Sequence, residues 1–252
     1  MEITAHHTHA IQAGESIIAI LNRYLPPLME GDIVAITSKI LSLCENQVIP
    51  KAQVPNKQAL IEQEADAYLM DGNGNDDNSQ NRYGVFLTIK NGILIPSAGI
   101  DESNVNEAYL LYPRDIQGSL TQIWNFLRER DHIKQLGLIL TDSHTTPLRR
   151  GTTGIGLGWC GFEALRSYIG KPDIFGRPLK VSVLNLLDSL ASAAVLVMGE
   201  GAEQTPLALI RQASNILFQD QAPAQDELNA IAIPLEDDLY APILKQASWS
   251  RA

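Results

Sequence analysis

The dipeptide Asn91-Gly92 constrains the fold more than any other feature, because it lies between two apolar runs. The run before it is Gly-Val-Phe-Leu-Thr-Ile-Lys (84–90), and the run after it is Ile-Leu-Ile-Pro (93–96). A type I′ turn needs positive φ at both central residues, and Asn-Gly tolerates this. The pattern predicts an antiparallel hairpin. Because helical segments flank it, we expect an α/β (α+β) fold with mixed sheets rather than a purely parallel sheet.

Helical and strand-like segments alternate along the rest of the chain. Apolar spacing and capping residues predict helices over 14–28, 56–70, 117–130 and 185–198, and apolar runs predict strands over 2–5, 32–37, 136–140 and 180–184. Asn185 can cap the last helix by accepting from a free backbone amide, and Gly199 can end it. Residues 71–81 are polar and rich in Gly and Asn, which predicts a loop.

Composition limits the class of protein. With 252 residues, of which 45% are hydrophobic, the chain can bury one large core, and no linker divides it. We therefore expect a single domain over residues 1–252, with a C-terminal tail over 213–252 where the composition changes. The net charge of −10 argues against a nucleic-acid-binding protein. Two cysteines, a polar start and short apolar runs predict a cytoplasmic protein without a membrane partner.

Two segments offer groups for phosphate and metal binding near predicted strand ends. Ser38 and Lys39 follow the strand over 32–37, where a hydroxyl and an ammonium can meet a phosphate, although an ordinary turn is an equally good interpretation. Asp101, Glu102 and Asn104 follow the hairpin and supply oxygen ligands of the kind that Mg²⁺ or Mn²⁺ prefers. A polar turn with a helix cap would explain the same residues.

Two further segments complete the pattern. Asp142 and Ser143 end the strand over 136–140, and Arg149 and Arg150 follow, where two guanidinium groups can bind phosphate or carboxylate and neutralise a transferring phosphoryl group. The segment 198–205 (Met-Gly-Glu-Gly-Ala-Glu-Gln-Thr) combines glycines for close backbone approach with carboxylates for a second cation. Carboxylates, arginines and glycine loops together are what phosphoryl transfer requires.

One glycine motif would indicate a different function, the binding of a dinucleotide. Gly156, Gly158 and Gly161 satisfy the spacing G-x-G-x-x-G of a dinucleotide site. Such a site needs a strand directly before it and a helix directly after it, and here the predicted strand ends roughly fifteen residues earlier. We therefore interpret these glycines as residues that permit tight loop packing. A dinucleotide-dependent oxidoreductase remains as an alternative.

Taken in order, these segments resemble the family of coenzyme F-420-0:L-glutamate ligases (gamma-glutamyl ligases). The resemblance runs from about residue 8 to 211 and is carried by GDIVAITSKI, AGIDESNV, TDSHTTPLRRG, GKPDIFGRPLKV and AAVLVMGEG. LTIKNGILIPSAGIDESN and MGEGAEQTPLA are similar to a bacterial branch called folate-metabolism gamma-glutamate ligases. The resemblance implies a two-lobed fold, a homodimer, and a ligase that uses GTP and Mg²⁺ or Mn²⁺. Such a ligase joins the amine of L-glutamate to an acceptor carboxylate through an acyl-phosphate.

The resemblance also implies roles for particular residues. It places the metal ligands at Asp101, Asp142, Ser143 and Glu200. It places the nucleotide at Thr8, His9, Ala10, Ile11, Ser38, Lys39, Asn104, Met198, Gly199, Gly201, Ala202, Glu203, Gln204 and Thr205. Arg149 and Arg150 are the catalytic candidates, steadying the transferred phosphoryl group or binding the glutamate carboxylate.

The sequence departs from the family pattern at two places. A family lysine is Leu43 here, and a family Phe-Gly-Arg is His144-Thr145-Thr146, which changes a phosphate or base contact and the acceptor pocket. GTP and another nucleoside triphosphate, and folate-like and F-420-0-like acceptors, therefore stay open. A non-catalytic protein that binds a nucleotide or metabolite on the same scaffold is the main alternative function.

Overall fold

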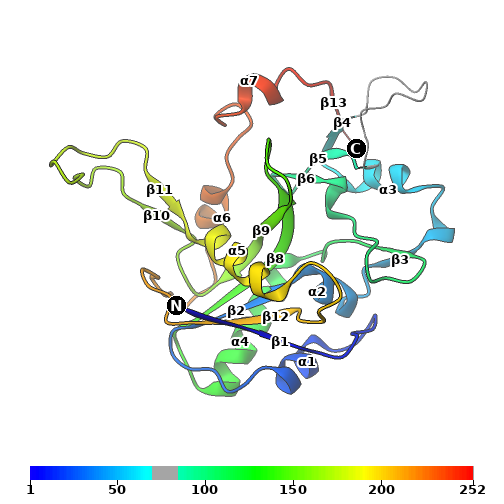
Figure 1. The fold of residues 1–252 in the computed structure, drawn as a ribbon, viewed down its shortest axis with the longest axis horizontal. Helices are drawn as coiled ribbons and strands as arrows, with labels where there is room; N and C mark the ends of the chain where they lie inside the picture. The colour runs from blue at the N-terminus through cyan, green and yellow to red at the C-terminus, as the bar shows by residue number, and fades with distance from the viewer. Residues whose placement is uncertain (70–84, 252) are drawn as a thin grey trace.

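The main sheet has five strands with helices on both faces (Figure 1). The computed structural model describes residues 1–69 and 85–251, so the loop predicted over 71–81 lies outside the described residues. The strand order is β1 (Glu2–His6), β12 (Leu207–Arg211), β2 (Asp32–Thr37), β8 (Leu136–Thr145) and β9 (Thr152–Cys160). β2 and β8 are parallel, and the other three pairings are antiparallel. The expected mixed fold is confirmed.

Strands β2, β8, β9 and β12 each contribute side chains to two cores, because successive side chains point to opposite faces. Val34 and Ile36 of β2 pack with α1 (Ile17–Tyr24), α2 (Ser38–Cys44) and α4 (Ile116–Asp131). Ile33 and Ala35 of the same strand pack with α5 (Leu186–Met198), and α6 (Gln225–Ile231) borders that core. The uninterrupted apolar sequence of β2 is thereby explained by burial on both sides.

A second, four-stranded sheet forms the smaller lobe, in the order β13 (Trp249–Ser250), β4 (Ala67–Leu69), β5 (Leu87–Lys90) and β6 (Ile93–Pro96). Asn91 and Gly92 have φ of 52° and 74°, so the predicted hairpin is confirmed. α3 (Lys57–Glu64) covers this lobe, and β3 (Val48–Pro50) pairs with β7 (Ala108–Leu110) beside it. Short 3₁₀ turns lie at Lys51–Gln53 and Ser97–Gly99.

The C-terminal segment returns to the smaller lobe. After β12 it forms α6 and α7 (Ala241–Leu244), and β13 then pairs with β4. The segment that we predicted as a tail over 213–252 therefore supplies an edge strand. None of the helices within 1–69 and 85–251 is long and apolar enough to cross a bilayer.

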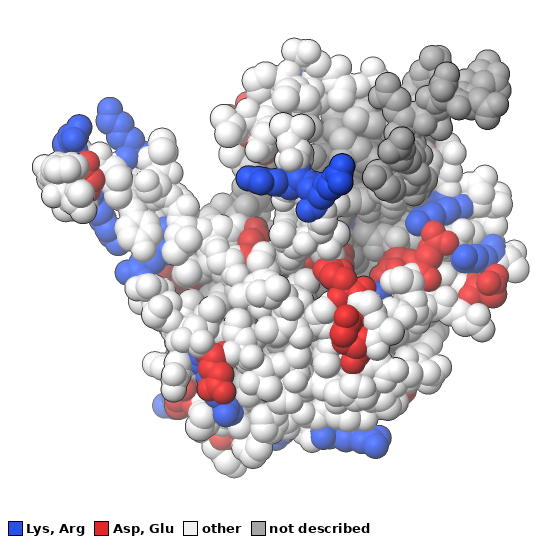
Figure 2. Space-filling view, viewed as in Figure 1, with Lys and Arg blue, Asp and Glu red and all other residues white. Residues whose placement is uncertain are grey.

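A hairpin arm extends away from both lobes (Figure 1). β10 (Leu165–Ser167) and β11 (Val183–Asn185) pair at its base, and the intervening residues form its tip. Ile174, Phe175 and Val181 are 93%, 74% and 84% exposed on it. Figure 2 shows Lys and Arg side chains gathered on the same arm.

The interpretation of the glycines after residue 150 as loop residues was wrong for Gly156 and Gly158. They lie within β9, where α4 and α5 pack closely on the strand. A Cβ on Gly154 would lie 2.4 Å from the backbone oxygen of Ala191, and one on Gly156 would lie 2.4 Å from the Leu187 side chain. Glycine in a strand often marks such a close approach. The expected strand over 136–140 also continues to Thr145.

We predict that Gly154→Ala destabilises the protein more than Gly158→Ala. The new methyl group at 154 meets backbone of α5, which cannot rotate away, whereas at 158 it meets the Ile116 and Leu120 side chains at 2.8 Å. Overpacking of this kind costs about 1–3 kcal/mol. Urea denaturation of both variants measures the difference. Equal midpoints would show that α5 tolerates displacement from β9.

Candidate functional site

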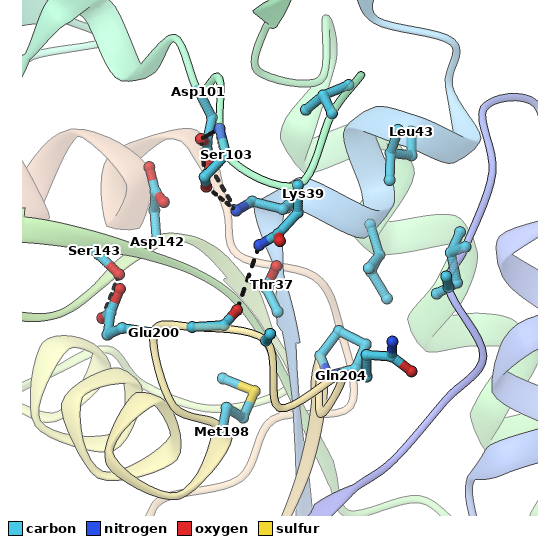
Figure 3. A pocket seen from close by; sticks show the side chains of 18 of the residues that line it. Thr37, Lys39, Leu43, Asp101, Ser103, Asp142, Ser143, Met198, Glu200 and Gln204 are labelled. Carbon is cyan, nitrogen blue, oxygen red and sulfur yellow. Dashed lines mark hydrogen bonds and ion pairs between the residues drawn. The ribbon is translucent and has the colours of Figure 1, made fainter.

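A cavity of about 780 Å³ opens at the edge of the main sheet where β2 ends beside Thr141 of β8 (Figure 3). Because these two strands are parallel and in register from Asp32↔Leu136 to Thr37↔Thr141, their carboxyl ends meet at one edge. Sites on open sheets gather at such edges. Segments 8–13 and 95–106, helix α2 and the loop between α5 and β12 close the other sides.

Lys39 and Asp101 form an ion pair within this cavity. Lys39 Nζ lies 2.7 Å from Asp101 Oδ2 and donates to Ser103 Oγ at 2.9 Å. The backbone amide and hydroxyl of Ser103 both donate to Asp101 Oδ1, at 2.6 and 2.7 Å. Burial alone would raise the pKa of Asp101, but Lys39 and Ser103 together hold it below its usual value. The carboxylate is therefore ionised at neutral pH.

Asp142 lies across the cavity from Lys39, near the end of β8. The hydroxyl of Tyr112 donates to Asp142 Oδ2. Burial is the main cause that raises the pKa of Asp142 from 3.8 to about 6, against the opposing bonds from Tyr112 and the Ser143 amide. Burial and the nearby carboxylate raise the pKa of Tyr112 well above 10, so its hydroxyl remains a donor.

The loop between α5 and β12 brings a third carboxylate to the cavity. α5 ends at Gly199, which has a φ of 78°. The next residue, Glu200, accepts through Oε1 from the Ser143 hydroxyl at 2.6 Å. Asn104 Nδ2 donates to the Gly201 carbonyl at 3.3 Å, so the loop is also linked to the segment that carries Asp101.

Most of the predicted site residues come together here. The cavity is lined by all four predicted metal ligands and by most predicted nucleotide-binding residues: Asp101, Asp142, Ser143, Glu200, Thr8, His9, Ala10, Ile11, Lys39, Asn104, Met198, Gly199, Gly201, Ala202, Glu203, Gln204 and Thr205. Ser38 is buried at the start of α2 and does not line it. Arg149 and Arg150 are exposed at the turn between β8 and β9, outside its lining.

One residue beside the cavity lacked a clear sequence signal. Tyr112 follows a short buried strand and belongs to no motif, yet it contacts Asp142. Leu43 lies one helical turn after Lys39 on α2, so both face the cavity. Leu43 therefore presents an apolar side chain to the cavity.

The oxygen atoms of the cavity suit a hard divalent cation that is also bound by water or by substrate phosphates. Within 1–69 and 85–251, no group of three or more His, Cys, Asp or Glu side chains is close enough to hold a metal ion alone. Mg²⁺ usually keeps several waters and uses one or two carboxylates plus substrate phosphates. Asp101, Asp142, Glu200 and the Ser143 hydroxyl are compatible with that mode of binding.

A dinucleotide site at the three glycines lacks its structural context. Gly156 and Gly158 are paired within β9, and Gly161 follows the strand with a φ of 82°. The next element is β10 rather than a helix. The order of strand, glycine loop and helix that a dinucleotide site requires is therefore missing at these glycines.

Comparison with known proteins shows the family of the chain. The family described as F420-0:Gamma-glutamyl ligase matches residues 6–212, and the chain belongs to this family. It is 32% identical over 203 residues to the Coenzyme F420:L-glutamate ligase of Methanothermobacter thermautotrophicus, covering 77% of this chain and 80% of the relative. It is 32% identical over 192 residues to that of Methanopyrus kandleri, covering 73% and 76%. The resemblance inferred from the sequence is confirmed.

We predict that Asp142→Asn stabilises the metal-free protein at neutral pH. The folded-state pKa of about 6 lies above the value of 3.8 for a free Asp, so stability falls as the pH rises between these two values. Asn cannot ionise and avoids this cost, which is about 1–3 kcal/mol above pH 6. Thermal unfolding with a chelator at pH 4 and pH 7.5 measures it. A variant no more stable than the wild type at pH 7.5 would contradict the prediction.

Proposed function

We propose that the protein is a ligase that adds L-glutamate to an acceptor carboxylate, using a nucleoside triphosphate and a divalent cation. The observation that carries the proposal is that Lys39 and three carboxylates, Asp101, Asp142 and Glu200, converge on one cavity from separate segments. Family membership and the names of the relatives support the glutamate-adding reaction.

The residues divide into two groups. Asp101, Asp142, Ser143 and Glu200 would hold Mg²⁺ or Mn²⁺, which when bound neutralises phosphate charge and polarises the phosphoryl group. Lys39 begins α2 and carries an ammonium that can bind a phosphate oxygen. In the nucleotide-free protein this ammonium is paired with Asp101, so a triphosphate and Asp101 compete for it.

The proposed reaction has two steps. An oxygen of the acceptor carboxylate attacks the γ-phosphorus, the bond to the β-phosphate oxygen breaks, and a nucleoside diphosphate leaves. The glutamate amine then attacks the acyl carbon of the acyl-phosphate, inorganic phosphate leaves, and the nitrogen loses a proton. Catalysis of phosphoryl transfer is mostly positioning and charge stabilisation, which suits a cavity of fixed charged groups.

The relatives' names suggest an F-420-type acceptor, and the bacterial resemblance suggests a folate-like one. Two features bear on the choice of substrates. Leu43 makes one wall of the cavity apolar, which bears on the choice between GTP and another nucleotide. His144-Thr145-Thr146 lie outside the cavity lining, on the projecting part of the β8–β9 hairpin, with Arg149 and Arg150. The arginines stay candidates for binding glutamate or phosphate.

We also propose that the chain is a cytoplasmic homodimer, with the arm over residues 165–185 seated on a second copy. The arm carries four basic residues and one acidic residue, whereas the whole chain has a net charge of −10. An acidic second copy therefore complements it in charge. Exposed Ile174 and Phe175 supply the apolar contact.

The alternative is a protein that binds a nucleotide or metabolite without turnover. Leu43 and the altered 144–146 segment favour it, because each replaces a group of the family pattern. Nucleotide binding without acceptor-dependent phosphate release would support this alternative over the ligase.

We predict that Asp142→Asn lowers acceptor-dependent phosphate release about 100-fold or more, because a neutral amide is a poor ligand for a hard cation. The assay contains purified protein, Mg²⁺ or Mn²⁺, GTP or ATP, L-glutamate, and an F-420-0-type or folate-type acceptor. Asp226→Asn, on the exposed start of α6, is the control for loss of an acidic charge. Phosphate release unchanged in Asp142→Asn would refute the assignment.

We predict that Phe175→Glu converts a dimer into a monomer of 27.6 kDa, because a charge buried at the proposed contact is unpaired. Light scattering after gel filtration gives the mass. Ile243→Glu makes the same change at a residue that is 70% exposed on α7 and should leave the dimer intact. If the wild type is monomeric, or if both variants behave alike, the arm is not the contact.

A further inference from the structure

Tyr112 is a half-buried tyrosine beside the cavity whose hydroxyl reaches the candidate metal site. It does not line the cavity, so it is not placed to touch a bound substrate. Its hydroxyl donates to Oδ2 of Asp142. Any role that it has in the reaction would be exerted through this carboxylate.

The backbone around Tyr112 also holds Asp101. Asp101 and Leu110 exchange two backbone hydrogen bonds, with the Asp101 amide donating at 3.0 Å and the Leu110 amide at 2.9 Å. Tyr112 follows Leu110 by two residues. The segment 101–112 therefore carries one candidate metal ligand at one end and, at the other end, the donor to the second ligand. Asp142 itself belongs to β8 of the main sheet.

The ring of Tyr112 has little freedom to turn away. A Cβ on Gly99 would lie 2.1 Å from Tyr112 Cζ and 2.5 Å from its hydroxyl oxygen, so the ring packs directly on the glycine backbone. Gly99 has a φ of 70°, a conformation that L side chains rarely adopt. Gly99 therefore has two roles: it permits the turn before Asp101, and its missing side chain leaves room for the ring of Tyr112.

We infer that Tyr112 is a positioning residue that fixes the orientation of Asp142 relative to Asp101 for divalent-cation binding. The inference rests on the proposed function, because it takes both carboxylates as metal ligands. Hydrogen-bond partners of ligating groups orient those groups, and their loss typically lowers metal affinity 10–100-fold. Asp101 and Asp142 come from different parts of the fold. Tyr112 links them, because its hydroxyl bonds to Asp142 and its segment pairs with Asp101.

The test measures binding of Mn²⁺ alone to the full chain, by the loss of its free-ion electron paramagnetic resonance signal. Tyr112→Phe keeps the ring on Gly99 and removes only the hydroxyl, so the fold is retained, as circular dichroism can verify. We expect about 10-fold weaker Mn²⁺ binding. In the ligase assay the metal concentration for half-maximal rate should rise similarly, with a smaller change in kcat at saturating metal.

Three variants give the experiment its controls. Tyr109→Phe removes a hydroxyl from the same segment, at a buried residue outside the cavity lining, and should bind Mn²⁺ as the wild type does. Asp142→Asn should lose binding. Tyr112→Met removes ring and hydroxyl together and should bind no better than Tyr112→Phe.

The outcomes separate the two proposals. If Asp142→Asn loses Mn²⁺ binding while Tyr112→Phe retains wild-type affinity, the positioning role is overturned and the proposed metal site stands. Loss in Tyr112→Met but not in Tyr112→Phe would assign the effect to packing and also overturn it. If Asp142→Asn binds Mn²⁺ normally, the metal assignment fails and the inference fails with it.

Discussion

The parallel pairing of β2 with β8 is the constraint on which the site depends. It aligns Thr37 with Thr141, so that Lys39 at the start of α2 and Asp142 near the end of β8 reach the same sheet edge. Both strands are buried on both faces, and hydrophobic burial therefore fixes their register. The charged groups add little to this placement and are held by a framework built from apolar side chains.

Three carboxylates of the cavity, Asp101, Asp142 and Glu200, have local ion-pair or hydrogen-bond partners. Lys39 neutralises Asp101 at 2.7 Å, Ser143 donates to Glu200, and Tyr112 donates to Asp142. Each of these three carboxylates thus has at least one partner, which limits the cost of placing acids around one cavity.

Local signals in the sequence predicted local features well. The Asn91-Gly92 turn and the Asn185 cap follow from the chemistry of a few adjacent residues, and the segments that carry Asp101, Asp142 and Glu200 were recognisable as motifs. The role of Tyr112 was not predictable, because it depends on a contact 30 residues along the chain. Arg149 and Arg150 follow Asp142 closely in sequence, but β8 stays extended and carries them away at about 3.3 Å per residue.

The two faces of the main sheet differ in the size of the side chains that they bury, and this has a consequence for the loop that carries Glu200. The face under α5 includes Ala35, Ala208, Gly154 and Gly156, so the helix lies almost on the strand backbone. Glu200 lies two residues after the last residue of α5. The small residues under α5 set the distance between this helix and the sheet, and that distance sets the position of Glu200. Substitutions at these distant positions can therefore move Glu200 relative to Ser143 by tilting one helix.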